Sequence, residues 1–209
     1  MTTTHGDARL VLATHNAHKI VELRAILTPL LPGLAEGAVV GAADVGAAEP
    51  VEDGVTFAEN ALIKARALAA HTGLPAVADD SGIAVDVLGG APGIFSGRWS
   101  GRHGDDEANL RLLLAQLSDV RDEHRAAAFV CAAALVLPDG AEHVREGRLA
   151  GTLLRAPRGD GGFGYDPILR PDGHERTCAE LDPEEKNAIS HRGRAFRALA
   201  PLVVETLLR

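Results

Sequence analysis

The stretch Pro75–Leu88, PAVADDSGIAVDVL, has two short apolar runs on either side of the polar segment Asp79–Gly82. The apolar runs predict β-strands at Pro75–Ala78 and Ile83–Leu88, and the glycine suggests a tight turn between them. Two adjacent carboxylates repel each other unless a cation or hydrogen bonds compensate. We therefore interpret Asp79–Gly82 as a functional turn at a strand end, where α/β proteins place ligands. Solvated carboxylates in an ordinary turn are the alternative.

Strand and helix patterns alternate on the N-terminal side of this stretch. A short apolar strand at Arg9–Ala13 precedes a helical pattern over residues 20–30, and a further strand is centred on Val39. Thr56 is a candidate N-cap with Glu59 three residues later, and the Ala-rich helix that it opens runs to about residue 71. This alternation is typical of an α/β fold.

The C-terminal side adds a hairpin and further helices. Arg125–Leu137 and Glu142–Ala150 predict an antiparallel pair. The other predicted elements are a loop at Gly89–Gly104, a helix capped by Asp105–Glu107, a glycine-rich loop at Arg158–Asp166, a strand near Ile168, a helix at Pro183–Ala188, a break at His191–Gly193 and a last helix that buries Phe196, Leu199, Val203 and Leu207. The pattern predicts a mixed sheet flanked by helices. We expect a flexible tail at residues 1–8 and one domain over residues 9–209.

The composition excludes several classes of protein. The longest apolar stretch, Ala126–Leu137, is 12 residues long, short of the roughly 18 to 20 that cross a bilayer. Met1–Arg9 has no apolar region typical of a signal peptide. A net charge of -8 disfavours binding to nucleic acid, which needs a basic face. Cys131 and Cys178 lie in no metal or disulfide motif, which fits a reducing cytoplasm. Taken together, these features predict a cytoplasmic protein without membrane or nucleic-acid partners.

Two candidate phosphate-binding features come first in the chain. The segment Thr14–Lys19, THNAHK, lies where a strand turns into a helix, and free backbone N–H groups at such a turn bind anions. A capped helix with a surface lysine is the alternative. Asn60 and Lys64 are four apart and share one helix face, although a lysine at the border of an apolar stripe is also common.

Carboxylates supply the candidate metal ligands. Asp79 and Asp80, with Glu52 or Asp53 from the acidic loop, offer hard oxygen atoms at a strand end. Mg²⁺ commonly takes one or two carboxylates and completes its shell with water and substrate phosphates. The sequence therefore suggests a magnesium site at Asp79 and Asp80.

Two further segments could recognise a base. The loop Gly161–Pro167 holds the only Tyr of the chain and one of five Phe, which favours base stacking or aromatic anchors in the core. Lys186 and Ser190–Gly193 gather cationic donors for a phosphate or carbonyl oxygen; a solvated helix junction is the alternative. Taken together, the candidate sites indicate a polyphosphate, a divalent metal and a stacked base, which is a nucleoside triphosphate.

Five segments in this order resemble the inosine/xanthosine triphosphate pyrophosphatase family, also called HAM1-like: THNAHK, TFAENALIKA, ADDSGIAVDVLGGAPGIFSGRWSG, GGFGYDPI and EEKNAISHRG. The resemblance covers about residues 10–207. It implies an elongated mixed β-sheet flanked by helices, in two lobes around a central active-site cleft. It also implies a cytoplasmic, Mg²⁺-dependent homodimer that cleanses the nucleotide pool by hydrolysing ITP, dITP and XTP to the monophosphate and pyrophosphate.

The resemblance also assigns roles to single residues. Asp80 matches the general base and a metal ligand, and Glu52 matches the second metal ligand, with Glu49 and Asp53 as rivals. The residues that match substrate-binding positions are Thr14, His15, Asn16, Ala17, His18, Lys19, Lys64, Ser81, Phe163, Gly164, Tyr165, Asp166, Lys186, His191 and Arg192.

The chemistry agrees with these roles. Attack of water on the α phosphorus needs a base, and cations must neutralise the developing charge. A hydrogen-bond donor such as Arg192 binds the 6-keto oxygen of a purine and is left unpaired opposite the 6-amino group of adenine. The chain has only three lysines, Lys19, Lys64 and Lys186, and all three fall in the predicted site. A Maf-like pyrophosphatase that prefers pyrimidine or modified nucleotides and a nucleotide-binding regulator without catalysis are the alternative functions.

Overall fold

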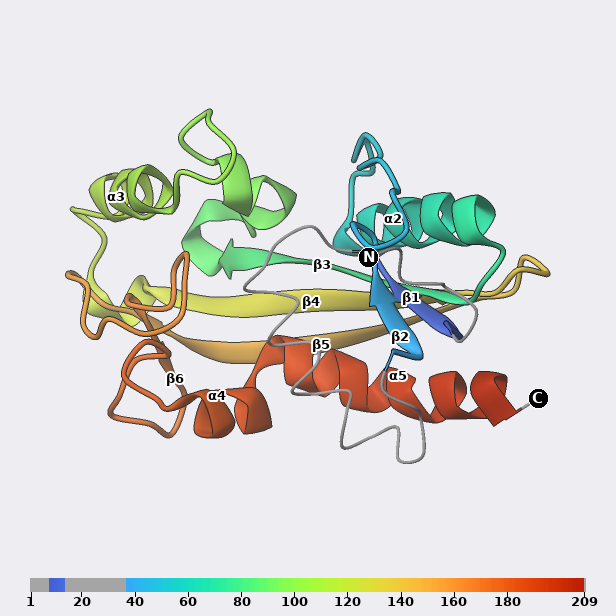
Figure 1. The fold of residues 1–209 in the computed structure, drawn as a ribbon. Helices are drawn as coiled ribbons and strands as arrows, with labels where there is room; N and C mark the ends of the chain where they lie inside the picture. Colours follow the sequence, from blue (N-terminus) through green and yellow to red (C-terminus); the bar gives the residue numbers. More distant parts are fainter. Residues whose placement is uncertain (1–7, 14–36, 209) are drawn as a thin grey trace. The chain divides into compact units, whose positions relative to one another are not determined.

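In the computed structural model, which describes residues 8–13 and 37–208, six strands form one sheet in the order β2-β1-β3-β4-β5-β6 (Figure 1). The strands are β1 (Leu10–Leu12), β2 (Val39–Gly41), β3 (Ala76–Val85), β4 (Ala126–Val136), β5 (Glu142–Leu153) and β6 (Leu169–Pro171). β1 pairs in parallel with β2 and β3, whereas β5 and β6 are antiparallel. The connection from β4 to β5 is too short for a parallel crossover, so this pair is antiparallel as well. The predicted mixed sheet is confirmed.

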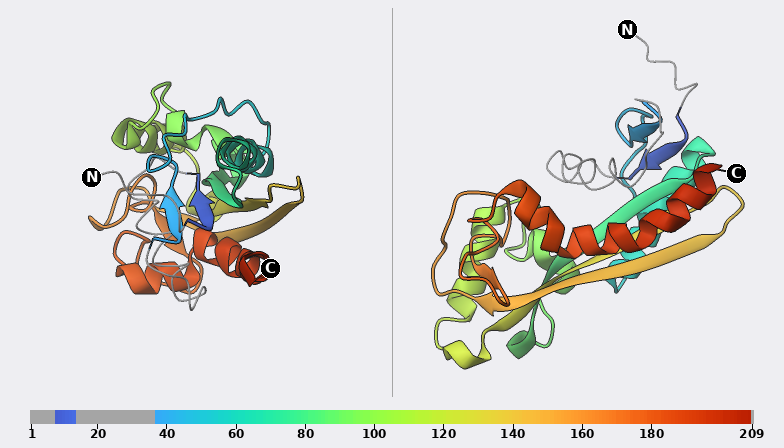
Figure 2. Two further views of the ribbon diagram at one scale, coloured as in Figure 1. Left: turned by 45° about the vertical axis from the view of Figure 1, so that its right-hand side comes forward. Right: turned by 90° about the horizontal axis from the view of Figure 1, so that it is seen from below.

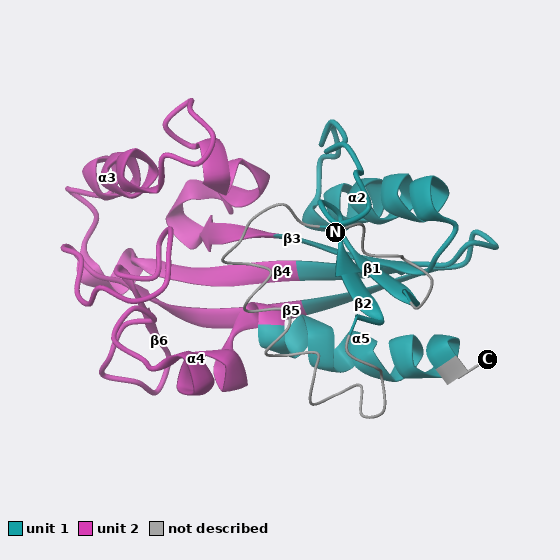
Figure 3. Cartoon of the chain, in the orientation of Figure 1, with its two compact units in different colours: residues 1–80, 132–146, 193–209 teal, residues 81–131, 147–192 magenta. Residues whose placement is uncertain are grey.

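Contacts divide the chain into two compact units, which Figure 3 colours separately. Unit 1 comprises Met1–Asp80, Ala132–Glu146 and Gly193–Arg209, and unit 2 comprises Ser81–Cys131 and Gly147–Arg192. β3, β4 and β5 therefore each contribute residues to both units. The single domain over residues 9–209 stays a prediction, and the predicted tail lies almost wholly outside the described residues.

In unit 1, helix α2 (Phe57–Thr72) lies on one side of the strands and the greater part of helix α5 (His191–Leu208) on the other (Figures 1 and 2). The predicted N-cap is confirmed, because Oγ1 of Thr56 accepts a hydrogen bond from the Glu59 N–H at 3.1 Å. Ala61 and Ala65 of α2 pack in a core that is rich in alanine. Since alanine is small, the helix backbone approaches the sheet closely, and longer side chains on the same helix face reach β3.

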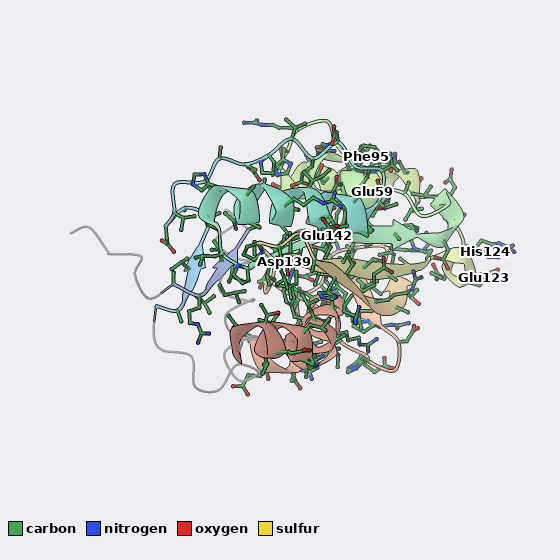
Figure 4. The ribbon with its side chains drawn as sticks, turned by 90° about the vertical axis from the view of Figure 1, so that its right-hand side faces the viewer. Glu59, Phe95, Glu123, His124, Asp139 and Glu142 are labelled. Atoms are coloured by element: carbon green, nitrogen blue, oxygen red, sulfur yellow. The ribbon has the colours of Figure 1, made fainter. Side chains whose placement is uncertain are left out.

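The hairpin between β4 and β5 is tied to α2. Asp139 and Glu142, which Figure 4 labels, lie at its turn and at the start of β5. Oδ1 of Asp139 accepts the Ala141 N–H at 2.9 Å, and both carboxylate oxygens of Glu142 accept from Arg66 of α2, at 2.6 and 2.7 Å. The predicted hairpin is therefore present, and a bidentate ion pair on the surface anchors it.

Unit 2 has its own apolar core, with α3 (Asp106–Gln116) and α4 (Pro183–Ile189) on opposite sides of its strands (Figures 1 and 2). Arg125 is buried in this unit, and its guanidinium donates to three backbone carbonyls, those of Leu117, Leu153 and Leu154. Burial lowers the pKa of Arg125 below its ordinary value. These three bonds satisfy the buried guanidinium. Because they join the end of α3 to the end of β5, the role of Arg125 is structural.

The predicted turn at Asp79–Gly82 is wrong, because β3 runs unbroken from Ala76 to Val85. Gly82 marks a close approach instead of a turn: a Cβ atom there would overlap the side chain of Ser96. Oγ of Ser96 accepts the Ile83 N–H at 2.8 Å. A glycine inside a strand often has this cause.

Two other boundaries differ from the prediction. β3 ends at Val85, and Asp86–Leu88 forms a 3-10 turn; the predicted loop that follows contains a second one, Gly93–Arg98. The break predicted at His191–Gly193 is confined to Ser190, since α5 already begins at His191. The Ser190 N–H closes α4 by donating to the Lys186 carbonyl at 2.8 Å. No helix in the described part of the chain is long and apolar enough to cross a membrane.

Candidate active site

The first cluster of candidate residues lies in unit 1 and is called here the Lys64 cluster: Glu52, Asn60, Lys64, Asp79 and Asp80. Nζ of Lys64 lies 3.1 Å from Oδ1 of Asp80 and 3.2 Å from Oε1 of Glu52. Nδ2 of Asn60 lies 3.4 Å from the other carboxylate oxygen of Asp80. Lys64 and Asp80 are both buried, with 8% and 7% of their surface exposed. One buried ammonium therefore joins two carboxylates that are far apart in the sequence.

Local structure fixes the members of the Lys64 cluster. Asn60 and Lys64 are four residues apart on α2, so both side chains leave the same face of the helix. Oδ1 of Asn60 accepts the Gly54 N–H at 2.9 Å, and a Cβ atom on Gly54 would lie only 2.6 Å from this oxygen. Because a backbone N–H can only donate, the amide oxygen faces Gly54 and the NH₂ group faces Asp80. The acidic loop that carries Glu52 is thereby held to α2.

The electrostatics of the Lys64 cluster keep its lysine charged. Burial alone would lower the pKa of Lys64, but the charges of Asp80, Asp79 and Glu52 outweigh this effect, and the pKa lies above its ordinary value of 10.5. Glu52 and Asp80 contact the ammonium directly, and the negative charge of Asp79 also acts on it. A cluster with this balance favours a further cation.

The donor set of the Lys64 cluster fits Mg²⁺. Glu52 and Asp80 direct hard carboxylate oxygens at one point, where the Lys64 ammonium now lies. Glu49, the rival ligand, lines a small pocket beside Lys64. Within residues 8–13 and 37–208, no three His, Cys, Asp or Glu side chains form a complete metal cage. Mg²⁺ does not need one, because it retains waters and binds substrate phosphates.

The second cluster lies in unit 2 and is called here the Phe163 cluster: Ser81, Phe163, Asp166, Lys186 and Arg192. Nζ of Lys186 lies 5.3 Å and Cζ of Arg192 lies 5.9 Å from the centre of the Phe163 ring. Nζ of Lys186 also donates to Oδ2 of Asp166 at 2.7 Å, and the Phe163 N–H donates to the same oxygen at 2.8 Å. Asp166 thus fixes both the aromatic residue and one of its two cations.

The glycine-rich loop is held by its other aromatic residue. Tyr165 is buried in the core of unit 2, and its hydroxyl donates to the Ser96 carbonyl at 2.9 Å. Burial raises the pKa of Tyr165 far above its ordinary value. Gly162 has a φ of +72°, and a Cβ atom there would overlap Asp166. Of the two interpretations of this loop, an aromatic anchor in the core therefore describes Tyr165, while Phe163 is the half-buried aromatic residue.

The junction of α4 and α5 supplies the last candidates. The His191 ring stacks on Phe129, with 4.9 Å between ring centres and 23° between planes. Nη2 of Arg192 donates to Oγ of Ser81 at 2.8 Å. His191 and Arg192 are both buried, so neither belongs to a solvated junction.

Most of the predicted site residues that the structure describes lie in these two clusters. Gly164 lies in the same loop, and its N–H donates to Asp106 at 3.1 Å. The candidates Thr14, His15, Asn16, Ala17, His18 and Lys19, as well as the predicted helix over residues 20–30, lie outside the described residues. Sequence reasoning paired Asn60 with Lys64 through their spacing, but the resemblance assigned a role to Lys64 alone. It also missed Ser96 and Phe129, for which the sequence held no signal.

Comparisons with known proteins agree with one another. The sequence pattern of the Ham1 family matches residues 10–202. A dITP/XTP pyrophosphatase of Streptomyces coelicolor is 68% identical over 199 residues, which are 95% of this chain and 98% of that protein. A crystal structure of a dITP/XTP pyrophosphatase from Mycobacterium abscessus is 56% identical, with a TM-score of 0.75 over 92% of this chain and 99% of that one. A HAM1 protein from Coxiella burnetii is 40% identical, with a TM-score of 0.84 over 95% and 99% of the two chains.

Proposed function

This chain belongs to the Ham1 family, and we propose that it hydrolyses dITP, ITP and XTP to the nucleoside monophosphate and pyrophosphate. It is a nucleoside triphosphate pyrophosphatase, as its relatives at up to 68% identity are. The observation that carries the proposal is the Lys64 cluster, in which a buried ammonium lies 3.1 Å from the carboxylate of Asp80. A carboxylate and a fixed cation side by side are what phosphoryl chemistry requires.

Asp80 is the proposed base. Its two oxygens have different partners, since Oδ1 accepts from Lys64 and Oδ2 from Asn60. These bonds fix the plane of the carboxylate, and the ammonium favours its charged form. A carboxylate held in this way orients a water molecule for attack on the α phosphorus and accepts its proton.

Lys64 is the proposed stabiliser of the leaving pyrophosphate. Its raised pKa keeps the ammonium charged, and an ammonium is a compact charge with donors that rotate. Glu52 and Asp80 would hold Mg²⁺, which would supply charge neutralisation on the phosphates when bound. The segment Thr14–Lys19 is proposed as a further phosphate site on the strength of the sequence.

The Phe163 cluster is the proposed purine site. Phe163 offers a flat face for stacking, and such stacking contributes about 1 to 3 kcal/mol per base. Arg192 would donate to the 6-keto oxygen of hypoxanthine or xanthine. Adenine carries a 6-amino group there, and an unmet buried donor costs about 1 to 3 kcal/mol. His191 and Lys186 would complete the polar edge of this site.

Pyrophosphate release tests the proposal. The purified protein would be assayed with Mg²⁺ on dITP, XTP, GTP, ATP, dTTP and UTP, with a chelator in parallel. We expect release from dITP and XTP well above that from GTP and ATP, and loss of release with the chelator. Preference for dTTP or UTP would instead support the Maf-like alternative. Binding of ITP without any pyrophosphate would support the regulator.

Two further predictions concern the whole protein. The cytoplasmic location rests on the sequence, in which Cys131 and Cys178 lie in no metal or disulfide motif. The homodimer rests on the resemblance alone, and light scattering during size-exclusion chromatography measures it.

A further inference from the structure

Ser81 makes a contact that its place in the sequence does not suggest. Its hydroxyl oxygen accepts a hydrogen bond from Nη2 of Arg192 at 2.8 Å, across 111 positions of the chain. Neighbouring residues of a strand point to opposite faces, so in β3 the Ser81 side chain leaves the strand on the other face from Asp80. Ser81 therefore belongs to the Phe163 cluster by contact, although it follows the proposed base directly.

The guanidinium that Ser81 contacts has little freedom. Arg192 is 2% exposed, and Cζ lies 5.9 Å from the centre of the Phe163 ring. A guanidinium is planar and carries its donors in a rigid fork. A bond from one N–H to the Ser81 hydroxyl therefore restricts the directions of the other N–H groups. The hydroxyl thus contributes to where Arg192 presents its donors to a ligand.

We propose that Ser81 is a positioning residue for purine selection, which acts through Arg192 and not on the phosphates. The inference rests on the proposed function, because it names how that site distinguishes a 6-keto purine from adenine. With Ser81 in place, Arg192 donates in the direction of the 6-keto oxygen. Without it, the guanidinium turns toward other acceptors, and the advantage of a 6-keto base falls.

The test compares two substrates that differ at the base. The ratio of kcat/KM for dITP to that for dATP would be measured for the wild type, Ser81→Ala and Ser81→Thr. We expect the ratio to fall about tenfold in Ser81→Ala, through a higher KM for dITP with little change for dATP. Ser81→Thr keeps the hydroxyl on a residue that suits a strand, and we expect it to restore the ratio.

A matched control is available in the same unit. Ser96 is also buried, and its hydroxyl accepts the Ile83 N–H at 2.8 Å and donates to the Gly93 carbonyl at 2.6 Å. Ser96→Ala therefore removes a buried hydroxyl without touching Arg192. We expect a lower Tm and an unchanged ratio of dITP to dATP.

A double-mutant cycle with Arg192→Lys tests the route of the effect. A lysine has no fork, so in that background Ser81→Ala should change the ratio no further. If Ser81→Ala does not fold, Ser81→Cys, with a weaker acceptor of similar size, decides the same question.

The outcomes separate the inference from the proposed function. An equal loss for dITP and dATP in Ser81→Ala, or an additive effect with Arg192→Lys, would mean that Ser81 acts on a part common to both nucleotides, and the inference would be overturned. A wild type that releases no pyrophosphate from dITP would overturn the proposed function itself, whatever the variants do.

Discussion

The Lys64 cluster and the Phe163 cluster each place a lysine beside an aspartate, yet their charges differ in sign. Lys64 contacts the carboxylates of Glu52 and Asp80, and the negative charge of Asp79 also acts on it. In the Phe163 cluster the one carboxylate, Asp166, pairs with Lys186, and a second cation, Arg192, lies near the Phe163 ring. The first cluster is suited to a further cation and the phosphates that it brings. The second is suited to a neutral ligand with a carbonyl oxygen.

The two clusters also differ in how the backbone carries them. Asn60 and Lys64 come from helix α2 and Asp80 from the middle of β3, which are regular elements. Phe163 and Asp166 come from a glycine-rich loop that depends on anchors elsewhere. Rigid elements position reacting groups more accurately than loops do. We therefore expect substitutions in the Lys64 cluster to affect kcat and those in the Phe163 cluster to affect KM.

The largest expected effect is that of Asp80→Asn. An amide cannot accept the proton from water, so we expect kcat for dITP to fall about 10³-fold. The circular dichroism spectrum should be unchanged, because the amide keeps the shape of the carboxylate. The control is Asp166→Asn, which makes the same change in the Phe163 cluster and should chiefly raise KM. Near-normal turnover by Asp80→Asn would remove Asp80 as the base.

Exchanging each lysine for arginine tests whether Lys64 and Lys186 have the same task. Lys64 donates to Asp80 and lies 3.2 Å from Glu52 in a buried space, and a wide guanidinium does not fit a place made for a compact charge. We expect Lys64→Arg to lower kcat/KM for dITP about 10²-fold. Lys186→Arg should lower it less than about tenfold, because arginine also pairs with a carboxylate and with an aromatic face. Equal effects would mean that the two lysines have the same task.

Features that depend on local sequence signals could be predicted from the sequence, whereas features that depend on distant contacts could not. The N-cap Thr56 and the approximate end of α2 were predictable, because the signals that begin and end a helix lie within a few residues of its ends. The mixed sheet followed from the alternation of strands and helices and from the hairpin. The continuity of β3 was not predictable, because Asp80 is stabilised there by Asn60 and Lys64, 20 and 16 positions away.

The candidate site shows the same division. The residue types at Lys64, Asp80 and Lys186 indicated a triphosphate and a metal, and the resemblance assigned the individual roles. No pattern distinguished Phe163 from Tyr165, although one faces two cations and the other lies in the core. The core position of Tyr165 depends on Ser96, 69 positions away, whose carbonyl accepts a hydrogen bond from the Tyr165 hydroxyl. Such contacts exist only in the folded chain.

Tyr165→Phe measures how far the Phe163 cluster depends on its loop anchor. The change leaves the buried Ser96 carbonyl without its donor, and we expect the free energy of unfolding to fall by about 1 to 3 kcal/mol. KM for dITP should rise with it, while kcat holds. Gln116→Ala is the control, because it removes the exposed acceptor of the Trp99 side chain and should change stability by less than about 0.5 kcal/mol. An unchanged stability in Tyr165→Phe would separate the loop from the core.

The ion pair between Arg66 and Glu142 lies outside both clusters, and its loss should have the least effect on the free energy of unfolding. The hydrogen bonds from Arg66 hold the pKa of Glu142 below its ordinary value of 4.5. A lowered carboxyl pKa adds stability above the unfolded value, and this contribution is lost as the pH falls through the folded value. The pair is half exposed, so we expect Glu142→Gln to lower the free energy of unfolding by about 0.5 kcal/mol near neutral pH. Urea unfolding at about pH 7 and about pH 2 should show this difference at the first value and none at the second. A loss much above 1 kcal/mol would mean that this exposed pair contributes as much to the free energy of unfolding as a buried pair. A difference in burial would then not explain a larger effect of substitutions at Lys64.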